Sequence, residues 1–148
     1  MPARRSTHPL DAVVSRFEST FGALILVQAV HSVEECYGRL WESFPPARFL
    51  TSLVSTDHGR AFVTLNVLLV AFGAWCYFWP VRRHWAIAVS LAWFWVCIET
   101  INGITHPLWS VIERGYTPGV VSAPVLFILA IYLASQLRRR VHDSPNAV

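Results

Sequence analysis

Four long apolar stretches, separated by short charged segments, run along the chain. They cover Phe21 to Trp41, Ala61 to Trp79, Trp85 to about Thr105, and Pro118 to Leu137. Each approaches the roughly 20 apolar residues that an α-helix needs to cross the hydrocarbon core of a bilayer. None shows the alternating apolar and polar pattern of a β-barrel strand. The pattern therefore predicts an all-α fold, a four-helix transmembrane bundle.

The first and third stretches differ from the other two because they carry polar and ionisable residues. These are Gln28, His31, Glu34 and Glu35 in the first, and Glu99, Asn102 and His106 in the third. With about 100° between successive residues of a helix, the four polar residues of the first stretch can face one neighbour. The three of the third stretch recur at i, i+3 and i+7. Two helices are therefore each predicted to present a polar stripe.

Charge agrees with a membrane protein and sets its orientation. Only 14% of the residues are charged and 54% are hydrophobic, against roughly 25% charged in a typical soluble domain. All 12 basic residues are arginine, and their main clusters are Arg4, Arg5 and Arg16, then Arg82 and Arg83, then Arg138, Arg139 and Arg140. Because basic clusters mark cytoplasmic segments, both termini are predicted to be cytoplasmic. Arginines confined to helix ends do not form a nucleic-acid surface, and nucleic-acid binding is excluded.

This topology divides the chain into a cytoplasmic N-terminal segment (residues 1–19), a membrane domain (20–137) and a basic cytoplasmic tail (138–148). The first and third helices then run in the same direction, and their polar stripes lie at one depth, in the outer half of the membrane. We expect a multi-pass protein of a bacterial-type plasma membrane, with membrane lipids as partners. The sequence does not indicate its oligomeric state.

Two connecting segments carry predictions of their own. The stretch "ARFLTSLVS", residues 47–55, is expected to lie along the membrane interface as a short amphipathic turn. The stretch "YTPG", residues 116–119, is expected to begin the fourth helix, with Thr117 as N-cap and Pro118 at the first helical position.

Three carboxylates in a membrane bundle cannot all stay ionised unless a metal ion, or His31 and His106 as imidazolium, supplies positive charge; otherwise some of the carboxyls must hold protons. Ionisable residues near the bilayer centre cost about 2.5 to 3.5 kcal/mol each on insertion scales, and they are functional by default. Imidazoles and carboxylates projecting from facing helices are typical of bundle metal sites. We therefore predict one divalent metal ion, zinc, iron or manganese, and its ligands are His31, Glu35, Glu99 and His106.

Other residues are assigned to catalysis and to the surroundings of the metal. Glu34 or Glu35, whichever is not a ligand, could act as general base on the metal's water. Four residues are expected beside the ligands or at the cavity, where they would contact a substrate: Gln28, Asn102, Trp95 and Tyr116. Trp95 lies one helical turn before Glu99, and the predicted topology places Tyr116 near the mouth of the site.

The same residues are compatible with several functions. We favour a metal-dependent enzyme, hydrolase-like, acting on a lipid or other apolar substrate. A metal-free isomerase would use the glutamates and histidines directly as acids and bases. A binding or transport protein would use them as an ion site or proton relay, and a purely structural plug would use them to fix helix register. The apolar cytoplasmic half of the third stretch, "WAIAVSLAWFWV", argues against a continuous transport path.

One short motif also carries a family resemblance. The pentad "HSVEE", from His31 to Glu35, resembles the pattern that names the HXXEE family of small membrane proteins. The segments "NGITH", Asn102 to His106, and "YTPG", Tyr116 to Gly119, are similar to its secondary motifs, and the likeness covers about residues 20–137. The resemblance implies a multi-span membrane domain and implicates His31, Glu34, Glu35, Asn102 and His106. Because the function of that family is unknown, the resemblance implies no substrate or cofactor.

Overall fold

The computed structural model describes residues 9–142, with side chains over residues 15–140. Within this range the fold is entirely helical, which confirms the predicted all-α class. The elements are α1 (Pro9–Tyr37), α2 (Leu40–Ser43), α3 (Pro45–Ser52), α4 (His58–Cys76), the π-helical η1 (Tyr77–Val81), α5 (Ala88–Glu113) and α6 (Ala123–His142). The predicted cytoplasmic ends at residues 1–8 and 143–148, with Arg4 and Arg5, lie outside the described residues.

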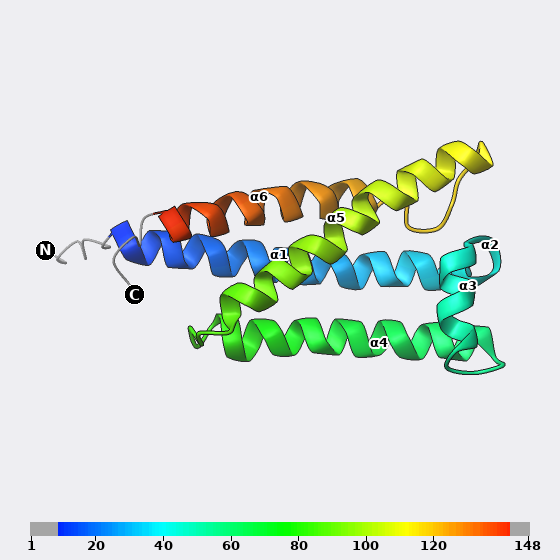
Figure 1. Cartoon of the computed structure of the whole chain (residues 1–148), viewed down its shortest axis with the longest axis horizontal. Helices are drawn as coiled ribbons and strands as arrows, with labels where there is room; N and C mark the ends of the chain where they lie inside the picture. The colour runs from blue at the N-terminus through cyan, green and yellow to red at the C-terminus, as the bar shows by residue number, and fades with distance from the viewer. Residues whose placement is uncertain (1–8, 143–148) are drawn as a thin grey trace, which may run out of the picture.

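The four long helices run up and down along one axis (Figure 1). Helix α1 lies between α6 and α4, while α5 crosses α1 obliquely and packs along α6. As predicted, α1 and α5 run in the same direction, opposite to α4 and α6. The start of α1, the end of α6 and the turn between η1 and α5 therefore share one end of the molecule. Helices α2 and α3 and the α5–α6 turn share the other end.

The helix ends follow from local backbone conformation. Helix α1 ends at Tyr37, before the predicted Trp41, because Arg39 adopts the left-handed conformation with φ 55°. Arg114, with φ 52°, ends α5 in the same way, so this helix continues well past Thr105. At the end of α4, Pro80 lacks an N–H group and the chain widens into the π turn η1.

The predicted start of the fourth helix is wrong. Residues 118–122 form turns, and α6 begins at Ala123. The N–H groups of Gly119, Val121 and Ser122 point to a carboxylate of α1, and Gly119 has a φ of 93° that a right-handed helix excludes. A contact with a distant helix therefore overrides the local signal for a helix start.

The apolar core fills the half of the bundle that contains the chain ends. Phe21 and Leu24 of α1, Trp95 of α5, and Leu133 and Leu137 of α6 are fully buried there. Helix α4 approaches this core at Gly73: a Cβ there would lie 2.9 Å from both Ile25 Cδ1 and Trp95 Cζ2. The polar stripes of α1 and α5 consequently lie in the other half, next to α2, α3 and the α5–α6 turn.

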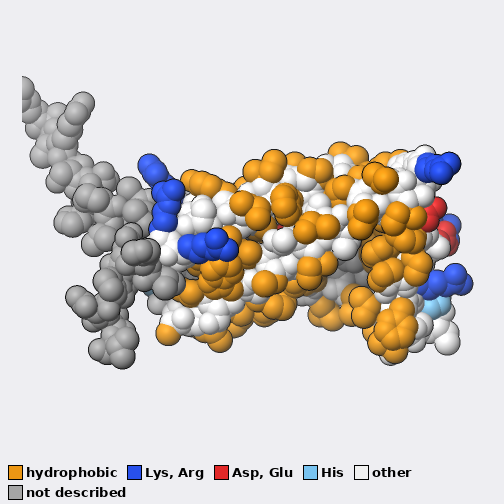
Figure 2. Space-filling view, turned by 45° about the horizontal axis from the view of Figure 1, so that its top comes forward, with side chains coloured by type: hydrophobic (Ala, Val, Ile, Leu, Met, Phe, Trp, Pro, Cys, Tyr) orange, Lys and Arg blue, Asp and Glu red, His pale blue; other side chains and the backbone are white. Residues whose placement is uncertain are grey.

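The outer surface of the bundle is largely apolar. Helix α4 continued by η1 (His58–Val81) and helix α5 are both long and apolar enough to cross a membrane. Only 22% and 28% of their apolar windows are buried inside the protein, so most of this apolar surface faces outward. Figure 2 shows apolar side chains along the middle of the visible face, while charged side chains gather at its two ends.

We predict that Gly73→Val destabilises the bundle. The added side chain would overlap Ile25 and Trp95, which are already buried, and overpacking of this kind typically costs about 1–3 kcal/mol. Thermal unfolding of the detergent-purified protein measures the effect. The matched control is Ala71→Val, on an exposed position of the same helix. Equal melting temperatures for the two variants would contradict the packing described for α4.

Candidate functional site

The Glu34 carboxylate, on the last turn of α1, holds the turn between α5 and α6. Its Oε1 accepts hydrogen bonds from Tyr116 Oη at 3.2 Å and from the N–H groups of Gly119 and Val121 at 3.1 Å each. Its Oε2 accepts from the N–H and the hydroxyl of Ser122, at 3.0 and 2.5 Å. Glu34 was predicted as a candidate base, and here both of its oxygens are occupied by this turn.

The same turn orients two imidazoles. Nδ1 of His106 lies 2.8 Å from the Pro118 carbonyl oxygen, which can only accept, so His106 carries its proton on Nδ1. Nδ1 of His31 lies 2.7 Å from Ser122 Oγ. That hydroxyl donates its single proton to Glu34, so it accepts from His31, whose proton is therefore also on Nδ1.

With these tautomers, the Nε2 lone pairs of both imidazoles face one oxygen of Glu35. Glu35 Oε1 lies 3.1 Å from Nε2 of His106 and 3.4 Å from Nε2 of His31. All three side chains are buried, and His31 Nε2 has no hydrogen-bond partner among the described residues. Three lone-pair atoms in such proximity repel one another unless a proton or a metal ion lies between them.

This three-residue group could hold a metal ion. Its candidate ligand atoms all lie within 4.8 Å of one another. Ligands bound tetrahedrally to zinc at about 2.0–2.1 Å stand roughly 3.4 Å apart, close to the separations between Glu35 and the two imidazoles. Metal-binding histidines almost always donate their other N–H to a carbonyl or a carboxylate network, as both histidines do here. The donor set and its surroundings therefore fit a divalent ion.

Glu99, the fourth predicted ligand, belongs to a second polar cluster two helical turns from His106. It is fully buried next to the Gln28 amide. In the amide orientation that gives both ends of Gln28 a partner, its nitrogen donates to the two Glu99 oxygens at 3.0 and 3.1 Å and its oxygen accepts from Ser32. Asn102 Nδ2 donates to Oε2 at 3.2 Å. Glu99 lies outside the three-residue group, and its role as a ligand stays a prediction. Gln28 and Glu35 are seven residues apart on α1, and Glu99 and His106 are seven residues apart on α5. The two stripes therefore pair at two successive levels, as stripes on parallel helices require.

Trp95 and Tyr116, which were also predicted to lie beside the ligands or at the cavity, do not contact the three-residue group. Trp95 is fully buried in the apolar core, where it stacks on Phe72 with ring centroids 6.1 Å apart. Tyr116 is exposed on the α5–α6 turn and reaches the site only through Glu34. Partial burial and the neighbouring Glu34 carboxylate raise the pKa of Tyr116, which keeps its hydroxyl in the donating form.

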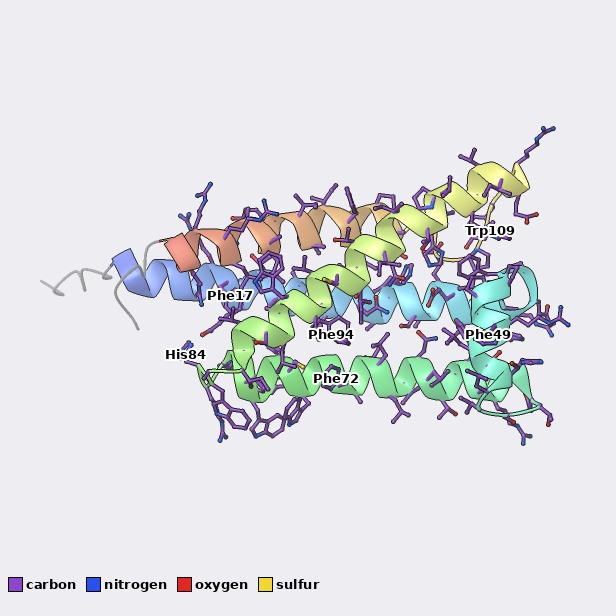
Figure 3. All side chains as sticks on the ribbon, viewed as in Figure 1. Phe17, Phe49, Phe72, His84, Phe94 and Trp109 are labelled. Carbon is purple, nitrogen blue, oxygen red and sulfur yellow. The ribbon has the colours of Figure 1, made fainter. Side chains whose placement is uncertain are left out.

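A cavity of about 350 Å³ adjoins the three-residue group. Glu35 and His106 form part of its wall, with the amides of Gln28, Asn66 and Asn102, and the remaining lining is mostly apolar. The Phe44 ring, at the junction of α2 and α3, lies 6.1 Å from the His106 ring and 5.4 Å from that of Trp109, which Figure 3 labels. Two of the three candidate ligands, Glu35 and His106, are therefore accessible from a largely apolar chamber.

Three residues of the turn were not singled out as functional from the sequence, although they complete the site. Ser122 and Pro118 bind the two imidazoles. Gly119 lets the rings approach, since a Cβ there would lie 2.5 Å from His106 and 2.9 Å from His31. The "YTPG" motif was the available signal, but as a helix start it indicated no contact with histidine.

We predict that Gly119→Ala impairs metal binding. The added methyl group would displace both imidazoles, and the φ of 93° is itself strained for alanine. Titration of Zn²⁺ into the purified protein, followed by calorimetry, measures the affinity. Gly115→Ala is the matched control in the same turn, because a Cβ there would meet only the Glu113 carbonyl oxygen, at 3.9 Å. Equal affinities for the two variants would contradict the geometry of the site.

Comparison with known proteins gives one match, to a family model. Neither the curated proteins nor the solved structures yielded a match. A family model described as "Protein of unknown function with HXXEE motif" matches residues 23–134, which include the three candidate ligands and the turn that orients them. The chain therefore belongs to the HXXEE family.

Proposed function

We propose that this protein is a metal-dependent membrane enzyme that hydrolyses a lipid or other apolar substrate. His31, Glu35 and His106 bind one divalent ion, and the adjoining cavity receives the substrate. One observation carries the proposal: Nδ1 of each imidazole is hydrogen-bonded to the α5–α6 turn, and Nε2 of each faces Glu35 Oε1 inside a buried site.

A four-span membrane topology with cytoplasmic termini is part of the proposal. It is supported by two helices of sufficient length and apolarity and by the apolar middle of the surface. The arginines at the end shared by the chain termini support the orientation: Arg16, Arg82, Arg83, Arg138 and Arg139. Exposed rings of Trp75, Trp79 and Trp85 near that end are typical of an aromatic belt at the interface.

The proposed chemistry depends on an ion that has three protein ligands and one coordination position left free. A divalent ion with two imidazoles and one carboxylate keeps a position for water, whose pKa it lowers to about 7. Glu34 is a positioning residue in this proposal, because its oxygens hold the turn. Glu35 lines the cavity and would supply the carboxylate ligand. Nitrogen and oxygen ligands together favour zinc, iron or manganese.

The rest of the bundle favours an enzyme over a transporter. Phe21, Leu24 and Trp95 are among the fully buried side chains that fill the half between the site and the chain ends. An ion path through that half would need polar groups or water in place of this core. A purely structural role for the polar cluster would not explain the cavity beside Glu35 and His106.

We predict that the purified protein contains close to one zinc, iron or manganese ion per chain. His31→Ala and His106→Ala should lose it, since each removes one of three protein ligands. Elemental analysis by mass spectrometry measures the metal content. His84→Ala, at the opposite end of the bundle, is the control and should keep the metal. A wild-type protein without stoichiometric metal, or unchanged content in both variants, would contradict the proposal.

We predict a smaller effect for Ser122→Ala, which removes the hydroxyl between His31 and Glu34. Loss of a hydrogen bond that orients a metal-bound histidine typically lowers metal affinity about 10- to 100-fold. Competition against a zinc chelator of known affinity measures the change. Ser135→Ala, elsewhere on α6, is the control. An unchanged affinity for Ser122→Ala would show that His31 is oriented without the turn.

A further inference from the structure

The mouth of the 350 Å³ cavity opens on the side of the bundle. Three lining residues from three different helices are exposed: Leu50 of α3, Leu65 of α4 and Ile101 of α5. Helices α4 and α5 are joined near η1 and diverge toward α3 (Figure 1). An opening bounded by these side chains lies on the apolar outer surface of the bundle. A molecule dissolved in the bilayer would therefore reach it without crossing water.

The cavity has an apolar body and one polar wall. Helix α4 contributes Asn66, which is half-buried in an otherwise apolar stretch and lines the cavity. Its Nδ2 donates to the Phe62 carbonyl oxygen within the same helix, while its Oδ1 has no hydrogen-bond partner among the described residues. Helix α5 contributes Asn102, whose Nδ2 donates to Glu99. Two amides thus face the chamber that Glu35 and His106 also line.

These features restrict the class of molecule that fits. Ligand pockets usually measure roughly 300–1,000 Å³, so this cavity is near the small end and suits one hydrocarbon chain better than two. An amide oxygen left without a partner in an apolar chamber is costly, which favours a ligand whose head group supplies a hydroxyl or an N–H donor. Among the described residues that line the cavity none is Lys or Arg, so no basic side chain is available to bind an anionic head group. The lining therefore favours an uncharged head group.

We propose that the substrate is an uncharged single-chain amphiphile whose head group carries a hydrogen-bond donor, such as a long-chain amide or a long-chain ester that bears a hydroxyl group. This proposal rests on the proposed function and deepens it. The chain enters from the bilayer between α4 and α5, next to α3, and the head group donates a hydrogen bond to Asn66 Oδ1, beside Asn102, Glu35 and His106. Hydrolysis would add water across the ester or amide bond, leaving a long-chain carboxylic acid and an alcohol or amine.

Binding of hexadecan-1-ol, which the proposed hydrolysis cannot consume, tests this proposal. Native mass spectrometry of the detergent-purified protein should show one bound molecule per chain. Asn66→Leu should bind it about five- to tenfold more weakly, as expected for the loss of one buried hydrogen bond. Thr64→Leu is the matched control, on an exposed position of the same helix, and should bind as the wild type does. Hexadecane should bind equally to wild type and Asn66→Leu.

A second variant addresses the route of entry. Leu65→Trp places a bulky ring at the mouth and should reduce hexadecan-1-ol binding without changing the metal content. Equal alcohol binding by wild type, Asn66→Leu and Leu65→Trp would overturn the proposal, and so would comparable binding of a two-chain diacylglycerol. Metal content measured on the same samples separates the two hypotheses. Retained metal with no alcohol binding refutes only the substrate class, whereas alcohol binding without metal refutes the metal-dependent enzyme.

Discussion

The Glu34 carboxylate is the interaction on which the site depends. By accepting five hydrogen bonds it converts residues 116–122 into a fixed turn. That turn supplies the Pro118 carbonyl to His106 and the Ser122 hydroxyl to His31. The carboxylate is a charged acceptor that serves several N–H groups at once, so its loss leaves those groups without partners. Through this turn, Glu34 sets the orientation of both imidazoles, whose Nε2 lone pairs face Glu35 Oε1, although it is hydrogen-bonded to neither ring.

Helix geometry explains why the motif contains two adjacent glutamates. Successive residues point about 100° apart, so neighbours cannot serve the same partner. His31 and Glu35, at i and i+4, share a face and meet His106 of the parallel helix α5. Glu34 points instead to the turn before α6. Glu35 thus faces the candidate metal position, while Glu34 holds the turn that orients the imidazoles. His31 belongs to both networks, because its Nε2 faces Glu35 and its Nδ1 is hydrogen-bonded to Ser122, which donates to Glu34.

Much of this arrangement was predictable from periodicity and charge. The positions of the polar residues predicted two stripes, and the arginine clusters predicted that the helices carrying them are parallel; together these indicated that His31, Glu35 and His106 meet. The turn was not predictable, because its conformation depends on Glu34, more than 80 residues away in sequence, and a Thr-Pro pair is also a good local helix start. The hydrogen-bond partners of Glu99 were not predictable for a related reason. Depth along a helix does not reveal which partner, Gln28 or an imidazole, reaches a carboxylate first.

The central claim is that two imidazole nitrogens and a carboxylate oxygen surround one metal ion. X-ray absorption at the edge of the metal found in the purified protein tests it most directly. We expect nitrogen and oxygen ligands at about 2.0–2.1 Å, with the scattering signal of two imidazoles. A sulfur ligand shell, or a spectrum without imidazole scattering, would contradict this coordination.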